Sequence, residues 1–238
     1  MGKRTDITGA GDGDVTARAG VGRAVADFIA EARAAPREGG RGRLIFALDA
    51  TMSRQPTWDL ACRLQAEMFQ AAEKAGGLAV QLVYYRGNGE AQASRWVADG
   101  AGLAGLMTGI ACRGGLTQIG RVLDHAARVA ARGPLPALVF VGDAVEEEPD
   151  RLCDAAARLA LLGTRAFVFH EGGDAKVGAV FREVARVTRG AYLPFDAAAA
   201  RELGALLAAI AAYAAGGRAA LEAAGTGAAR RLLADLRP

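Results

Sequence analysis

Short apolar segments alternate with longer amphipathic segments along most of this chain, and that alternation limits the fold more than any other feature. The predicted parallel strands are apolar runs at 44–48, 78–86, 136–143, 165–170 and 191–196. The main predicted helices, which carry apolar residues at helical spacing, lie at 56–75, 103–112, 149–163, 177–190 and 200–215. Alternating strands and helices are typical of a parallel sheet with helices on both faces. We therefore predict a doubly wound α/β domain.

One predicted strand, 93–99, departs from this pattern because its sequence, "ASRWVAD", alternates polar and apolar residues. Only the turn "GNGEAQ" separates it from the strand at 78–86. A link this short permits an antiparallel hairpin but not a parallel crossover. The predicted sheet therefore has six strands and is mostly parallel, with one antiparallel strand at its edge.

The predicted α/β domain occupies residues 43–215, and the flanking segments differ from it in character. Residues 1–14 are rich in Gly and Asp, which predicts disorder. Residues 15–42 are interpreted as an amphipathic helix followed by the linker "PREGGRGR". Residues 216–238 contain helical stretches on either side of a Gly-Thr-Gly break, and we interpret them as a short C-terminal helical extension.

The composition argues against several classes of function. The formal net charge is +3, and aromatic residues make up 6% of the chain. The arginines are scattered among acidic residues, so we expect no nucleic-acid partner. The cysteines form neither a metal-ligand pattern nor a disulfide framework. The sequence shows no signal segment, and no run approaches the roughly 18 apolar residues of a membrane span. We therefore expect no membrane partner and a cytoplasmic location.

Oxygen-bearing side chains follow two of the predicted strands. The stretch "LIFALDATMS" places Asp49 at the end of the first strand, followed by Thr51 and Ser53. Asp143 ends the strand "PALVFVGD", and Thr117 lies in the Gly-rich loop "GGLTQIG". In open α/β sheets, ligands bind at the carboxyl ends of the strands where the strand order reverses. If it reverses between these two strands, the five residues face one crevice, where oxygen donors with few carboxylates suit Mg²⁺ or Mn²⁺.

Taken in order, these motifs resemble the von Willebrand factor type A (VWA) domain family, which includes bacterial intracellular proteins. The family's metal-ion-dependent adhesion site (MIDAS) is built from Asp-x-Ser-x-Ser, a distant Thr and a later Asp. Asp49, Thr51 and Ser53 match the first part, with Thr in place of the first Ser. Thr117 matches the distant Thr, in a stretch with one inserted residue, and Asp143 matches the later Asp.

The resemblance covers about residues 43–215 and implies a function as well as a fold. In this family the site is as a rule not catalytic, and the metal accepts an acidic side chain from a partner protein. Hydroxyl and water ligands leave the charge of the ion incompletely neutralised, so an incoming carboxylate binds strongly. The resemblance implies a protein–protein interaction module that depends on Mg²⁺ or Mn²⁺ and whose partner presents an acidic residue.

Two alternatives remain open at this point. Haloacid-dehalogenase-like Mg²⁺-dependent phosphatases also place an Asp after the first strand. They need a second Asp two residues on, where this chain has Thr51, and a lysine in an order that Lys3 and Lys74 do not follow. The other alternative is a scaffold of the same fold without a functional metal site, in which Asp49 only caps the next helix.

Three neighbouring features carry further expectations. The run Glu146–Glu148 is interpreted as a solvated acidic loop or, alternatively, as a filter that decides which partners approach. Thr117 is expected in a surface loop, so that removal of its hydroxyl costs no more than about 0.5 kcal/mol of stability. Tyr84 and Tyr85 lie inside a strand, so we expect them to point to opposite faces and to need no ligand.

Overall fold

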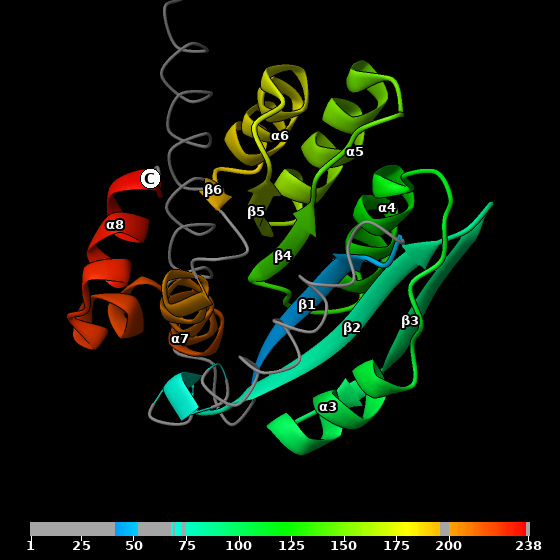
Figure 1. The fold of residues 1–238 in the computed structure, drawn as a ribbon. Coiled ribbons are helices and arrows are strands. Elements are labelled where there is room, and N and C mark those ends of the chain that lie inside the picture. Colours follow the sequence, from blue (N-terminus) through cyan, green and yellow to red (C-terminus); the bar gives the residue numbers. More distant parts are fainter. Residues whose placement is uncertain (1–40, 52–67, 69, 73–74, 196–199, 237–238) are drawn as a thin grey trace, which may run out of the picture. The chain divides into compact units, whose positions relative to one another are not determined.

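The computed structural model describes residues 41–51, 68, 70–72, 75–195 and 200–236 (Figure 1). These residues all belong to one compact unit, 41–238. The predicted segment 1–14 and residues 15–40 of the predicted segment 15–42 lie outside the described residues, as do Ser53 and most of the helix predicted at 56–75. The first element described is therefore the first strand of the sheet.

A single mixed sheet of six strands runs through the described residues. Its strands are β1 (Gly42–Asp49), β2 (Leu78–Arg86), β3 (Glu90–Val97), β4 (Ala137–Gly142), β5 (Arg165–Glu171) and β6 (Ala191–Phe195). They lie in the order β3-β2-β1-β4-β5-β6. Neighbouring strands are parallel except β2 and β3, which form an antiparallel hairpin at one edge. The predicted six-stranded, mostly parallel sheet with one antiparallel edge strand is confirmed.

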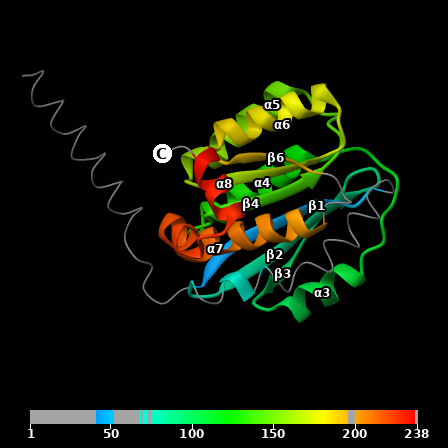
Figure 2. The ribbon, with the colours of Figure 1, turned by 60° about the vertical axis from the view of Figure 1, so that its left-hand side comes forward.

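Helices cover both faces of this sheet, as Figures 1 and 2 show. One face is covered by α4 (Ile119–Ala130), α5 (Pro149–Leu161) and α6 (Ala175–Val187). The other face is covered by α3 (Gly100–Thr108), α7 (Ala200–Ala224) and α8 (Gly227–Asp235). Each face has its own buried apolar cluster. The predicted doubly wound architecture is confirmed.

Strand β1 shows how the sequence fills both faces. Leu44, Phe46 and Leu48 belong to the cluster under α3, α7 and α8. Ile45 and Ala47 belong to the cluster under α4, α5 and α6. None of these five side chains is more than 1% exposed. Because successive side chains point to opposite faces and helices cover both, this strand is apolar throughout and not only at alternate positions.

The helix predicted at 103–112 begins and ends earlier than its apolar pattern indicates. α3 starts at Gly100 because Asp99 caps it: Oδ1 of Asp99 accepts a hydrogen bond from the N–H of Gly102 at 2.7 Å. The helix ends at Thr108. Residues 110–118 therefore form an irregular loop, and this loop carries Thr117.

The C-terminal helices are part of the core. The backbone of α7 is interrupted at Gly217, which has a φ of 68° and a ψ of −159°. Beyond this break, Leu221 and Leu232 join the same buried cluster as the first part of α7. Gly42 at the start of β1 packs directly on α7, since a Cβ there would lie 2.2 Å from the carbonyl oxygen of Ala214. Only glycine permits so close an approach of two backbones.

One segment of α7, Gly204–Ala224, is long and apolar enough to cross a membrane when it is judged by length and composition alone. Its mean hydropathy is 1.4, and half of it is buried. It packs against β1 and α8. By composition, therefore, the chain does carry a run of membrane-spanning length, contrary to the expectation from the sequence. Within the described residues this run serves as a core helix.

Candidate functional site

The strand order reverses between β1 and β4, as the predicted crevice requires. β1 lies between β2 and β4. The strands that follow β1 in sequence, β2 and β3, lie on one side of it, and β4, β5 and β6 lie on the other. The register pairs Leu48 with Val141. Asp49, which ends β1, and Asp143, which follows β4, therefore lie at the same edge of the sheet. This edge is the position at which open α/β folds bind ligands.

Hydrogen bonds from a neighbouring strand and a neighbouring loop fix the turn that follows β1. Oδ1 of Asp49 accepts the N–H of Thr51 at 2.7 Å. Ala50 donates its N–H to the carbonyl of Tyr85 at 3.0 Å and accepts the N–H of Arg113 at 3.0 Å. Asp49 is 2% exposed and Thr51 is 9% exposed. Asp49 and Thr51, the first two residues of the predicted metal motif, are thus held, nearly buried, at the carboxyl end of β1.

The loop at 110–118 reaches this edge because it is tied to the end of β2. The guanidinium of Arg86 donates to the carbonyl of Ala111. Gly115 lies directly on the backbone of Gly87: a Cβ on Gly115 would be 2.2 Å from the Gly87 carbonyl oxygen. A side chain at this position would push the loop away, which explains why the loop before α4 needs a glycine here.

Thr117 is buried, at 7% exposure, and contacts the loop that follows β4. Its hydroxyl donates to Oε2 of Glu147 and accepts the N–H of Glu146 at 2.9 Å. Its own N–H donates to Oε2 of Glu146 at 2.6 Å. The second carboxylate oxygen of Glu147 accepts the N–H of Gly120 at 3.2 Å. The two glutamates thus bond N–H groups at the N-terminus of α4, where Gln118 provides no side-chain cap.

Two expectations from the sequence are wrong at this point. Thr117 is not an exposed loop residue, because its side chain is buried and its hydroxyl makes two hydrogen bonds. The run Glu146–Glu148 is not simply solvated, because two of its three side chains bond residues 117–120. Glu146 and Glu148 are exposed, as expected of a solvated loop, whereas Glu147 is half-buried.

Tyr85 lies at the site, although no motif in the sequence indicates it. Its side chain and that of Tyr84 pack on opposite faces of the sheet, as expected. The buried hydroxyl of Tyr85 approaches the Asp49 carboxylate without a hydrogen bond of standard geometry to any described residue. Burial raises the pKa of Tyr85 well above its usual value, and the negative charges of Asp49, Glu147 and Asp143 raise it further. The negative charges of three carboxylates therefore all act on the buried hydroxyl of Tyr85.

Strand register is the signal that would have identified Tyr85. β1 and β2 are parallel, and the register places Tyr85 beside Asp49. Any residue so paired lies at the same edge as the first carboxylate of the motif. Glu147 has no comparable signal, because its position depends on how the loop after β4 folds against the N-terminus of α4.

The side chains at this edge fit a hard divalent cation in their chemistry. The donors predicted from the sequence and described here are the carboxylates of Asp49 and Asp143 and the hydroxyls of Thr51 and Thr117, all of them oxygen donors. Among the described residues, no group of three or more His, Cys, Asp or Glu side chains is arranged to hold an ion. A cation at this edge would therefore depend on hydroxyl and water ligands in addition to carboxylates, a ligand set that Mg²⁺ accepts.

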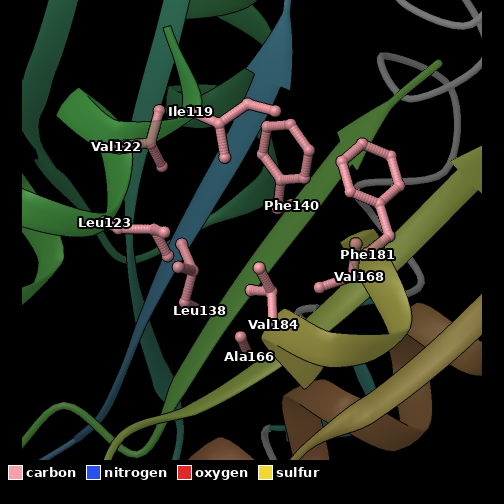
Figure 3. A pocket seen from close by; sticks show the side chains of 9 residues that line it. All are labelled: Ile119, Val122, Leu123, Leu138, Phe140, Ala166, Val168, Phe181 and Val184. Atoms are coloured by element: carbon pink, nitrogen blue, oxygen red, sulfur yellow. The ribbon is translucent and has the colours of Figure 1, made fainter. Parts of the chain in front are cut away.

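The cavity shown in Figure 3 lies apart from these donors, between α4, β4, β5 and α6. Its volume is about 10 Å³, and it is lined by the apolar residues Ile119, Val122, Leu123, Leu138, Phe140, Ala166, Val168, Phe181 and Val184. A space this small, without polar groups, does not hold an ordered water or a ligand. The cavity is a packing gap in the core.

Comparisons with known proteins find similarity in structure and not in sequence. No family model matches the sequence, and no curated protein matches it. The VWA domain of SpRpn10 is similar with a TM-score of 0.55 and 10% identity over 69% of this chain and 95% of that domain. The vWF domain of the type V pilus tip protein Mfa5 from Porphyromonas gingivalis has a TM-score of 0.52 and 13% identity over 73% of this chain and 95% of that one.

A third similar structure is proximal thread matrix protein 1 from the mussel byssus, solved with a zinc-occupied MIDAS motif. It has a TM-score of 0.55 and 14% identity over 71% of this chain, which spans 45% of that protein's length. Identities this low establish shared architecture and nothing finer. The chain described here therefore has the fold of a von Willebrand factor type A domain.

Proposed function

We propose that this chain is a protein–protein interaction module that depends on a divalent cation, and that it is not an enzyme. Mg²⁺ or Mn²⁺ would be held by Asp49, Thr51, Ser53, Thr117 and Asp143. The observation that supports the proposal is that the elements carrying these residues, the ends of β1 and β4 and the loop before α4, come to the same edge of the sheet at the switch point of a VWA fold. The zinc-occupied MIDAS of the mussel protein is a precedent for a divalent metal in this fold.

The proposed partner is a protein that presents an acidic side chain. A bound cation would supply the positive charge that attracts a carboxylate. The residues of this chain would limit how far that charge is neutralised, since Thr51 and Thr117 contribute neutral hydroxyls. Leu116, next to Thr117, is 57% exposed and offers an apolar contact beside the site. The site thus combines an ionic anchor with an accessible loop.

The phosphatase alternative finds little support in the same geometry. Thr51 stands where that chemistry needs a second carboxylate, and its N–H is bonded to the carboxylate that would act as nucleophile. Lys176, the one lysine among the described residues, lies exposed in the first turn of α6 and follows β5, not the loop near Thr117. A non-catalytic role therefore fits these residues better.

A metal titration tests the proposal. The wild-type protein should bind Mg²⁺ or Mn²⁺ in calorimetry and melt at a higher temperature with metal. A ligand of the native state stabilises by mass action, by about 4 kcal/mol at a thousand times its Kd. Asp49→Asn should remove both effects. Asp174→Asn is the matched control, because Asp174 also follows a strand at this edge but caps α6, accepting the N–H groups of Lys176 and Val177.

The partner is tested by pull-down from the native lysate with wild type and Asp49→Asn, each in Mg²⁺ and in EDTA. A partner retained only by wild type in Mg²⁺ is the expected result. Retention in all four samples would show that recognition uses another surface. If metal changes neither heat nor melting, the chain is a scaffold without a metal site. Turnover of a phosphomonoester that Asp49→Asn abolishes would instead favour the phosphatase.

A further inference from the structure

The hydrogen bonds of Thr117 determine which part of its hydroxyl is free to face a cation. A hydroxyl carries one proton and two lone pairs. Here the proton is donated to Oε2 of Glu147, and one lone pair accepts the N–H of Glu146 at 2.9 Å. No described residue takes the second lone pair. Because a cation binds a lone pair and repels a proton, this arrangement prepares Thr117 to act as a ligand.

Glu147 is the group that fixes the direction of this proton. An ionised carboxylate can only accept hydrogen bonds, so the hydroxyl of Thr117 must donate to it. Glu147 is itself held in place, because its other oxygen accepts the N–H of Gly120 at 3.2 Å. That bond lies at the N-terminus of α4, where the helix dipole favours a negative charge.

We propose that Glu147 is a positioning residue of the cation site, whose carboxylate holds the proton of Thr117 away from the cation and keeps a lone pair directed at it. This inference rests on the proposed function, because it takes Thr117 as a cation ligand. In this role Glu147 does not touch the ion. Removal of such a supporting hydrogen-bond partner typically weakens metal binding by about 10- to 100-fold.

The substitution Glu147→Gln should reverse the hydrogen bond without removing the side chain. If the amide oxygen keeps the N–H of Gly120, the amide NH₂ turns toward the hydroxyl of Thr117. Both lone pairs of that hydroxyl then accept N–H groups, from position 147 and from Glu146, and its proton is left to point at the cation. The side chain would still fill the same space, but Thr117 would become a poor ligand.

Calorimetric titration of the full chain with Mg²⁺ and with Mn²⁺ measures the effect. Glu147→Gln should raise the Kd about tenfold or more. Glu148→Gln removes the same charge from the same loop and serves as the matched control. It should change the Kd by no more than about threefold, because Glu148 is exposed and bonds none of residues 117–120 in the described structure.

A double-mutant cycle separates positioning from a general loss of structure. In a Thr117→Val background, Glu147→Gln should change the Mn²⁺ Kd by no more than the Glu148→Gln control does, because the hydroxyl that it orients is gone. The melting temperature in EDTA shows whether each variant is folded. The proposal is overturned if Glu147→Gln weakens binding no more than Glu148→Gln does, or weakens it equally in the Thr117→Val background. If wild type binds no metal at all, the proposed function fails and this inference fails with it.

Discussion

Two buried threonines tie loops together at opposite ends of the sheet, and they differ in the chemistry of their partners. Thr164, just before β5, is fully buried, and its hydroxyl donates to the carbonyl of Leu135, just before β4, at 2.6 Å. Thr117 makes the corresponding link at the carboxyl end, but there the hydroxyl lies between the N–H of Glu146 and the carboxylate of Glu147. The hydroxyl of Thr164 donates to a neutral backbone carbonyl, whereas the hydroxyl of Thr117 donates to a charged carboxylate.

This difference separates a threonine that supports the fold from one that supports a site. The bond of Thr164 joins two neutral groups out of contact with water, so its effect is confined to stability. The bond of Thr117 brings a carboxylate to an edge where Asp49 and Asp143 already lie. Negative charges brought together in this way repel one another in the folded state, and they attract a cationic ligand.

The largest effect on metal-free stability is expected for Thr164→Val. Valine keeps the shape of the side chain but leaves the buried carbonyl of Leu135 without its hydrogen bond, a loss of about 1–3 kcal/mol. In a chain of this size, each kcal/mol lowers the melting temperature by about 2–4 °C. Thermal unfolding in EDTA measures the loss, and the Mg²⁺ Kd should stay the same. A Kd that rises together with the lost stability would show that the two ends of the sheet are not independent.

A smaller loss of stability is expected for Thr117→Val, although it removes two hydrogen bonds. Its partners are an exposed glutamate and a half-buried one, so water can replace the lost hydroxyl. The cost in EDTA should be about 1 kcal/mol. Stabilisation by saturating Mg²⁺ should fall strongly in this variant, while in Thr164→Val it should be unchanged. A cost in EDTA greater than that of Thr164→Val would contradict the contrast between the two threonines.

The smallest expected effect concerns His125, a half-buried titratable residue of α4. Its Nε2 shares a hydrogen bond of 2.9 Å with Oε1 of Gln81, whose amide nitrogen donates to the carbonyl of Ser94 at 2.8 Å. Burial lowers the pKa of His125, and the charge of Arg128 lowers it further. The unfolded chain, in which the pKa returns to about 6.5, therefore takes up the proton more readily. Stability contributed by neutral His125 is fully present above about pH 6.5 and is lost as the pH falls through the folded pKa.

Urea unfolding of wild type and His125→Gln, at about pH 7.5 and about pH 5.5, isolates this contribution from that of the carboxylates. Wild type should lose more of its free energy of unfolding over this interval than the variant. Equal losses in the two proteins would show that His125 does not titrate differently in the folded chain.

The sequence predicted the sheet well because the signals for strands are local. The limits of β2 were predicted residue for residue at 78–86, since Gly76-Gly77 and the turn at Gly87 bound an apolar run. The start of α3 was misplaced by three residues, because the cap at Asp99 decides it and the apolar pattern does not. The start of β3 was also misplaced by three residues, because Glu90, Ala91 and Gln92, predicted as part of the turn, pair with β2.

The candidate site was predictable only in part. Asp49 and Asp143 lie at one edge as expected, because a strand end fixes the position of the residue that follows it. Their role as ligands, like that of Thr51 and Thr117, stays a prediction. Glu147 was not predictable as a partner of Thr117, because that contact joins two loops 30 residues apart in the sequence. The orientation of the Glu147 side chain depends on the unpaired N–H groups at the start of α4, and no sequence pattern indicates that orientation.

The pairing of β1 with β4, in which Leu44 lies beside Ala137, also has a consequence for the order of folding. The two strands are distant in the sequence, and contacts of this kind form slowly because a long loop must close first. Asp49 and Asp143 come together only when this central pair has formed, so the proposed cation site is absent from every partly folded state that lacks the pair. A cation at this edge would therefore bind the native state in preference to such states and lower their population.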